Sequence, residues 1–163
     1  NVGHRPRHAA FSSDGLLVVV HEMNNVLTLH SFDEHTGDIG PVLDSQPTFP
    51  HAGLAQVPPG TFWAAAEIAL HPPSGRLFAS TRAIGAGFGF VAEHNFVRGL
   101  APAVEDTGAR LVAVQDTATL TNPRSFVFDA SMRWMVVGGK GGFMSYPISS
   151  DGHMGAAKES LLE

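Results

Sequence analysis

The sequence repeats one pattern three times, and this repeat limits the chain to a small set of folds. Each copy holds two short apolar segments that flank a polar turn. The first segment of each copy ends at Phe11, Leu70 or Phe128, so the copies lie 59 and 58 residues apart. A repeat of this length is typical of a four-stranded unit with generous loops, such as the blade of a β-propeller.

Each copy predicts antiparallel strands. In the first copy, residues 7–11 and 16–22 are rich in apolar residues, and Ser12-Ser13-Asp14-Gly15 between them has turn composition, with Gly15 able to take a positive φ. Residues 26–32 alternate as a third strand, and a fourth begins at Ile39. No segment favours a long helix; residues 156–162 fit a strand or a short helical end. The fold class is therefore all-β, with four-stranded antiparallel blades.

The predicted units cover residues 6–63, 64–121 and 122–163, with a long connecting loop at 46–62 and an insertion at 94–107. Together they form one partial propeller domain over residues 1–163. Propellers usually contain four to eight blades, so three blades cannot close a ring. We expect either that these residues belong to a longer chain, which we favour, or that copies assemble into a homo-oligomer.

Composition excludes several kinds of partner. With 44% apolar and 15% charged residues the chain is globular, and its net charge of −5 argues against a nucleic-acid surface. No apolar run approaches the roughly 20 residues of a membrane-spanning helix, so no membrane association is expected. The absence of cysteine is typical of a reducing compartment and favours a cytoplasmic location.

No motif predicts a cofactor or a metal. The glycine-rich residues 85–89 lack the spacing and the following helix of a dinucleotide site, and residues 138–142 lack the frame of a phosphate-binding loop. The nine histidines are spread over different segments rather than spaced as metal ligands. A serine-hydrolase elbow is also missing.

Equivalent positions of the repeat carry the candidate site. In a propeller, the starts of the first strands and the ends of the second strands face one mouth of the central channel. Two carboxylates, an imidazole and several guanidiniums there would suit acid–base chemistry on an anionic substrate, although charges at strand ends are often only solvated ion pairs. The polar residues at these positions are Arg7, His8, Glu22, Glu67, Arg82, Arg124 and Ser125; in the third copy the second strand ends at Gly139, with Lys140 next to it.

Glu67 is the sharpest candidate because its neighbours in sequence are Ala64, Ala65, Ala66 and Ile68. Apolar surroundings favour the protonated form of a carboxylate, and such a group can act as a general acid or base.

Several motifs resemble the seven-bladed lactonase family, which includes propeller-type 6-phosphogluconolactonases and fungal 3-carboxy-cis,cis-muconate cyclases. Pro6-Arg7-His8 with Phe11 and Asp14-Gly15 resembles its opening motif, and Glu22-Met23 with Asn25-Val26 resembles its N-E-L-x-N-x-V motif. Ala65-Ala66-Glu67-Ile68, Ser80-Thr81-Arg82 and Asn122-Pro123-Arg124 resemble three later motifs. The resemblance covers nearly the whole chain but only about three of seven blades. His21, Met23 and Thr81 depart from the family pattern and bear on substrate identity rather than on the fold.

The resemblance implies a cofactor-independent enzyme acting on a small anionic lactone. It implies His8, Glu22, Glu67 and Arg82 as catalytic residues and Arg7, Arg82 and Arg124 as substrate-binding residues. In the favoured reaction, 6-phosphogluconolactonase-like hydrolysis, a carboxylate or His8 activates water and an arginine or His8 stabilises the oxyanion. A lactone-forming muconate-type cycloisomerase needs the same groups and is the first alternative. A non-catalytic propeller that binds a partner or anion is the second.

Overall fold

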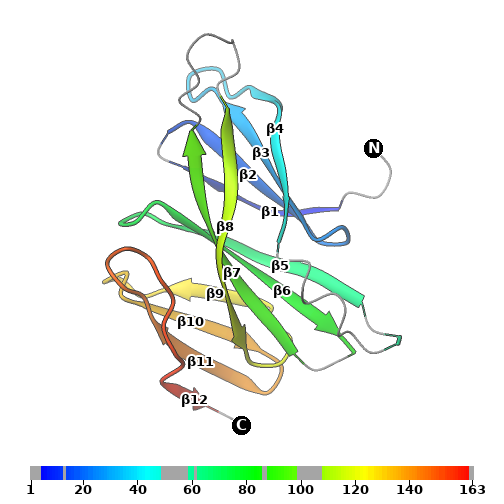
Figure 1. The fold of residues 1–163 in the computed structure, drawn as a ribbon, viewed down its shortest axis with the longest axis vertical. Coiled ribbons are helices and arrows are strands. Elements are labelled where there is room, and N and C mark those ends of the chain that lie inside the picture. Colours follow the sequence, from blue (N-terminus) through cyan, green and yellow to red (C-terminus); the bar gives the residue numbers. More distant parts are fainter. Residues whose placement is uncertain are drawn as a thin grey trace.

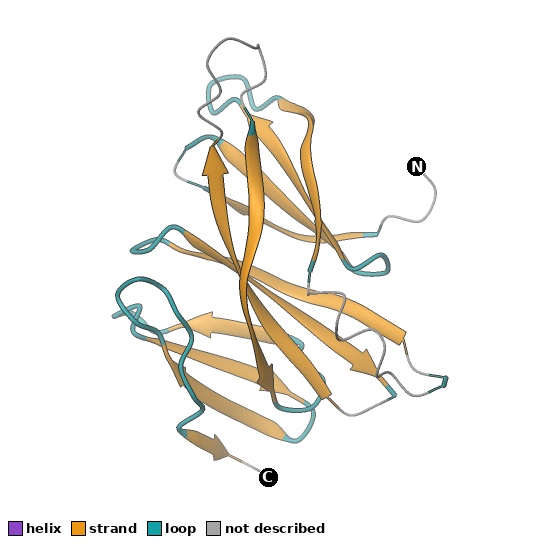
Figure 2. Ribbon diagram, in the orientation of Figure 1, coloured by secondary structure: helices purple, strands orange, loops and turns teal. Residues whose placement is uncertain are grey.

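The computed structural model describes residues 5–12, 14–48, 59–60, 62–85, 88–98 and 108–161. These residues form three four-stranded antiparallel sheets that follow one another along the chain (Figure 1, Figure 2). The predictions of an all-β fold and of four-stranded antiparallel blades are confirmed. The described residues contain no helix long and apolar enough to cross a membrane.

Each sheet runs in simple up-and-down order, so every strand pairs with its neighbours in sequence. The first sheet holds β1 (Pro6–Phe11), β2 (Leu16–His21), β3 (Val26–Phe32) and β4 (Ile39–Pro47). The second holds β5 (Phe62–His71), β6 (Arg76–Ile84), β7 (Phe88–Arg98) and β8 (Ala109–Thr119). The third holds β9 (Ser125–Phe128), β10 (Trp134–Gly139), β11 (Gly142–Pro147) and β12 (Glu159–Leu161).

Several boundaries differ from those predicted. The predicted insertion begins inside β7, which continues to Arg98 because it pairs with β8 along its whole length; residues 99–107 lie outside the described part. The predicted loop at 46–62 overlaps the last residues of β4 and the first of β5, and its residues 49–58 and 61 are also outside that part. Near the C-terminal end, Glu159–Leu161 is a strand paired with β11 rather than a helical turn.

Two apolar clusters join the three sheets. The first lies between the first and second sheets and includes Val18, Leu27 and Leu77, all fully buried. The second lies between the second and third sheets and includes Phe78 and Met135, also fully buried. Burial of such side chains is the main favourable term in folding, so these inter-sheet layers hold the strand ends of successive sheets in fixed relation.

Two β-bulges occur at equivalent positions of the repeat. In β1 the register with β2 shifts between Pro6 and His8, and in β5 the register with β6 shifts between Ala65 and Ile68. The extra residue leaves a backbone amide outside the ladder, and in β5 the amide of Glu67 donates to Ser80 Oγ at 2.9 Å. A bulge changes the direction of nearby side chains, and these two bulges therefore set how Arg7 and Glu67 project.

Candidate active site

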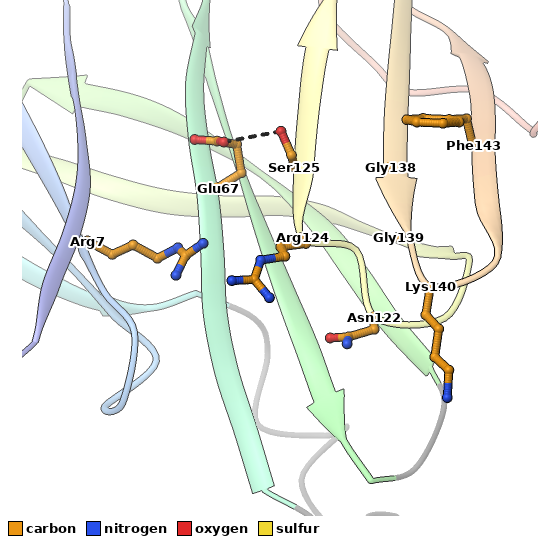
Figure 3. Close-up of a pocket in the computed structure, with 9 residues that line it drawn as sticks. All are labelled: Arg7, Glu67, Asn122, Arg124, Ser125, Gly138, Gly139, Lys140 and Phe143. Carbon is orange, nitrogen blue, oxygen red and sulfur yellow. Dashed lines mark hydrogen bonds between the residues drawn. The ribbon is translucent and has the colours of Figure 1, made fainter.

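A cavity of about 600 Å³ lies where the three sheets meet (Figure 3). Arg7 of β1 and Glu67 of β5 form one side of its lining, and the rest comes from the third sheet and the segment before it. The full lining is Arg7, Glu67, Asn122, Arg124, Ser125, Gly138, Gly139, Lys140 and Phe143.

Glu67 makes contacts to groups from all three sheets. Its Oε2 accepts a hydrogen bond from Ser125 Oγ at 3.4 Å, and its Oε1 lies 3.9 Å from His8 Nδ1. The backbone amide of Ile68 also donates to Oε1 at 3.1 Å. The apolar surroundings expected for Glu67 are therefore wrong: its side chain is 20% exposed and has polar partners, because the bulge directs it to the cavity and not into the apolar layer.

Glu22 follows β2, and its carboxylate binds the side chains of two arginines. Arg7 Nη1 lies 3.3 Å from its Oε1, and Arg82 Nη2 donates to the same oxygen. Burial of Glu22 raises its pKa, but the hydrogen bond from Arg82 and the charges of Arg7 and Arg82 outweigh burial, and the pKa lies below its ordinary value of 4.5. The backbone of Glu22 also accepts from Ala65 N at 3.0 Å, so this residue ties the first sheet to the second.

Arg82 is deeply placed, with 4% of its surface exposed. Its guanidinium donates to the carbonyl oxygens of Ala64 and Ala65, at 3.4 and 3.1 Å, as well as to Glu22. It is absent from the cavity lining. Through these contacts Arg82 links the Glu22 carboxylate to the backbone of β5.

Arg7 and Arg124 face the cavity from opposite sides, and Figure 3 shows their guanidiniums pointing toward each other below Glu67. Arg7 is held by Ala66 O, which accepts from Nε at 3.0 Å, and by Glu22. Arg124 is exposed, and within the described residues no acidic side chain pairs with its guanidinium. Of the two arginines in the cavity lining, Arg7 is bound to Glu22, whereas Arg124 has no acidic partner among the described residues.

The structure thus brings the candidates of the sequence analysis into one region. His8, Glu67 and Ser125 lie side by side, and Arg7, Glu22 and Arg82 form a second group. Arg7 belongs to both, since it binds Glu22 and lines the cavity. Across the part of the chain that the structure describes, no three His, Asp or Glu side chains gather in a metal-binding arrangement.

Asn122, Gly138 and Phe143 were not indicated by the repeat. Gly139, with Lys140 next to it, is at the strand end equivalent to Glu22 and Arg82, but neither was predicted as a site residue, and the run 138–142 of four glycines around Lys140 indicated only a turn. A Cβ on Gly139 would lie 2.5 Å from Thr121 O, and one on Gly89 would lie 2.2 Å from Pro123 Cδ. Glycine at both positions lets the segment before β9 pack closely, and this packing places Arg124 beside Glu67.

A scan against protein-family models matches residues 1–155 to the family described as Lactonase, 7-bladed beta-propeller. The chain belongs to this seven-bladed β-propeller lactonase family. The motifs that suggested it are those that carry Arg7, His8, Glu22, Glu67, Arg82 and Arg124.

Solved structures of low sequence identity share the fold of this lactonase-family chain. Proteins provisionally named 6-phosphogluconolactonases, from Bacteroides fragilis and Bacteroides uniformis, are each 18% identical with a TM-score of 0.72 over 98% of this chain. A protein from Lactobacillus plantarum is 20% identical with a TM-score of 0.71 over 97%. The chain spans only 40–42% of the length of these three structures. The comparison with curated proteins gives no match.

Proposed function

We propose that the protein containing this chain hydrolyses a small lactone that carries a negative charge. The observation that supports this most directly is Glu67, a carboxylate inside a 600 Å³ cavity that also contains the cationic side chains of Arg7, Arg124 and Lys140. A carboxylate can take a proton from water, and guanidiniums can bind an anionic group or a developing oxyanion. Membership of the lactonase family favours an ester-type carbonyl as the group attacked.

In the proposed reaction, Glu67 acts as general base. It accepts a proton from a water molecule, whose oxygen forms a bond to the lactone carbonyl carbon. Arg124 and Arg7 stabilise the oxyanion of the tetrahedral intermediate. The ring C–O bond then breaks, and the leaving alkoxide takes a proton from Glu67 or from a protonated His8, which lies 3.9 Å from Glu67. The product is an open-chain hydroxy acid.

Glu22 and Arg82 act through Arg7 in this scheme. Both lie outside the cavity lining, and Glu22 is bound by the two arginines. We therefore assign them a positioning role: they hold the Arg7 guanidinium at the cavity wall. This differs from the direct catalytic role that the family resemblance implies for these two residues.

The test is turnover by the full-length protein. 6-Phosphogluconolactone and 3-carboxy-cis,cis-muconate are supplied in parallel, and ring opening and ring closure are followed separately. On the lactone, Glu67→Gln should lower kcat by at least roughly 100-fold, the usual loss when a general base is removed. Glu34→Gln removes an exposed carboxylate elsewhere and should leave kcat unchanged; circular dichroism checks that both variants fold.

Each other outcome has a distinct meaning. Closure of the muconate without lactone hydrolysis would replace hydrolysis by the lactone-forming reaction. Binding of either compound without turnover would favour a non-catalytic propeller. Full activity of Glu67→Gln would remove the carboxylate from the mechanism.

A further inference from the structure

A smaller cavity adjoins the candidate active site and shares two of its residues. It has a volume of about 210 Å³ and is lined by Ala83, Gly85, Thr121, Asn122 and Lys140. Asn122 and Lys140 also line the larger cavity, so they form the wall between the two spaces. We propose that Lys140 is a specificity-determining residue that binds a second anionic group, at the end of the substrate remote from the reacting carbonyl. This inference rests on the proposed function.

The direction of the Lys140 side chain separates it from the arginines. Figure 3 shows the two guanidiniums turned toward each other near Glu67, whereas the Lys140 ammonium points away from them, toward the end of β6. Ala83 of β6 and Gly85, just after it, belong to the smaller cavity only. A substrate whose reacting carbonyl lies beside Glu67 would therefore meet Lys140 with its remote end.

The backbone that presents Lys140 is held in place. Its amide donates to Thr121 O at 2.8 Å, and Gly139 before it packs so closely on the same segment that a Cβ would be 2.5 Å from that oxygen. The turn that follows uses Gly141 and Gly142 at φ values of 92° and 137°, which only glycine adopts readily. The tip of the β10–β11 hairpin is thus fixed against residues 121–122, and Lys140 extends from a defined point.

The charge around Lys140 is suited to an anion. Among the described residues, none in the lining of the smaller cavity is acidic, and Glu67 is the one acidic residue in the lining of the larger cavity. Within the described residues no carboxylate forms an ion pair with Lys140. A cation with no fixed counter-charge at a cavity wall attracts a phosphate or carboxylate. In this arrangement Lys140 binds the remote anionic group, and Arg7 and Arg124 bind the lactone carbonyl group that is attacked in the reaction.

The test compares two lactones that differ only in the remote group: 6-phosphogluconolactone and glucono-δ-lactone. In the full-length protein, Lys140→Gln should raise KM for the phosphorylated lactone about 10-fold with kcat nearly unchanged, because one charge-assisted hydrogen bond is lost. KM for the neutral lactone should not move. Lys140→Arg should restore most of the affinity. Lys158→Gln removes the same charge from an exposed lysine outside both cavities and serves as the matched control.

A binding measurement keeps this inference separate from the proposed function. If neither lactone is hydrolysed by the unaltered protein, the proposed reaction fails, and calorimetry with the open-chain acids 6-phosphogluconate and gluconate then decides about Lys140. Weaker binding of 6-phosphogluconate alone in Lys140→Gln supports the subsite. Three outcomes would overturn the subsite: an equal effect of Lys140→Gln on both lactones or both acids, no effect on either, or the same effect in Lys158→Gln. Lys140 would then be a solvated lysine at a hairpin tip.

Discussion

Glu22 shows how much one residue contributes to the arrangement of the site. Its carboxylate receives Arg7 from its own sheet and Arg82 from the next, and its carbonyl accepts the amide of Ala65. Removing its charge would leave the deeply placed Arg82 with one acceptor fewer. An unpaired buried cation is costly, so Glu22 is important for stability as well as for the position of Arg7.

The lowered pKa of Glu22 gives a prediction for stability against pH. Because the carboxylate is favoured in the folded protein, its contribution is fully present above pH 4.5 and is lost as the pH falls through the folded pKa. At pH 7, Glu22→Gln should reduce the free energy of unfolding by roughly 1.5–3 kcal/mol, the range for hydrogen bonds to charged groups. The difference from the unaltered protein should shrink below pH 4.5.

Urea unfolding at pH 7, 4.5 and 3 measures this difference. Glu34→Gln is the control, because its carboxylate is exposed and outside the arginine cluster, and it should change little at any pH. A Glu22→Gln effect of constant size across this range would show that the arginine contacts of the carboxylate do not stabilise the fold.

At the scale of strands and turns, the sequence predicted most of the architecture. The turn at Gly15, with φ of 69°, and the hairpins of each copy follow from local composition. Because the copies can be aligned, the neighbourhood of His8, Glu67 and Ser125 was also predictable. The bulges in β1 and β5 were not, because residues 6–11 and 62–71 show no regular apolar–polar alternation in which the shift caused by an extra residue could be seen, and so the polar surroundings of Glu67 were missed.

The rest of the cavity depends on close packing between two segments, which the alignment of the repeats does not reveal. Asn122 and Lys140 reach the site because the end of β10 packs on the segment before β9. This packing is possible only because Gly139 has no side chain. In the sequence, however, a glycine within a glycine-rich run is equally consistent with an ordinary hairpin turn. Close backbone approach of this kind is visible only in three dimensions.

The role of Gly139 can be tested against its neighbour. A Cβ at Gly139 would meet the carbonyl oxygens of Thr121 and Asn122, at 2.5 and 3.0 Å, whereas one at Gly138 would meet the Phe143 ring at 3.1 Å, and that ring can move. Gly139→Ala should therefore lower the free energy of unfolding by about 1–3 kcal/mol, the usual cost of overpacking, and Gly138→Ala by clearly less. Urea unfolding compares the two; equal losses would show that the approach is not tight.

At the scale of the whole molecule, the first and the third sheet each have one face on which no other sheet packs in the described structure. Comparison of the repeats shows this for the third sheet. Leu27, Val91 and Phe143 occupy equivalent positions, because their partners across the second and third strands, Val20, Ser80 and Gly138, are equivalent in the three copies. Leu27 and Val91 are fully buried by the sheet that follows, but Phe143 is 57% exposed. At the other end, Phe11, Leu17, His30 and Val42 form one row across the first sheet, and Phe11 and Val42 are exposed.

The exposed face of the third sheet is equivalent to the face by which the middle sheet packs on the third. The exposed face of the first sheet is equivalent to the face by which the middle sheet packs on the first. The two exposed faces are therefore of the kinds that pack against each other within the chain. We therefore expect the isolated 163-residue chain to associate head to tail, with the outer face of the third sheet of one copy on the outer face of the first sheet of another. In sedimentation velocity runs, its mean mass should rise with concentration. Phe143→Lys should shift it toward the monomer, whereas Val112→Lys, which changes an exposed apolar residue on β8 of the middle sheet, should not. A monomer at every concentration would show that these faces do not bind each other, and so would equal effects of the two substitutions. In that case the apolar residues of the two faces would be covered only by other sheets of a complete seven-bladed ring.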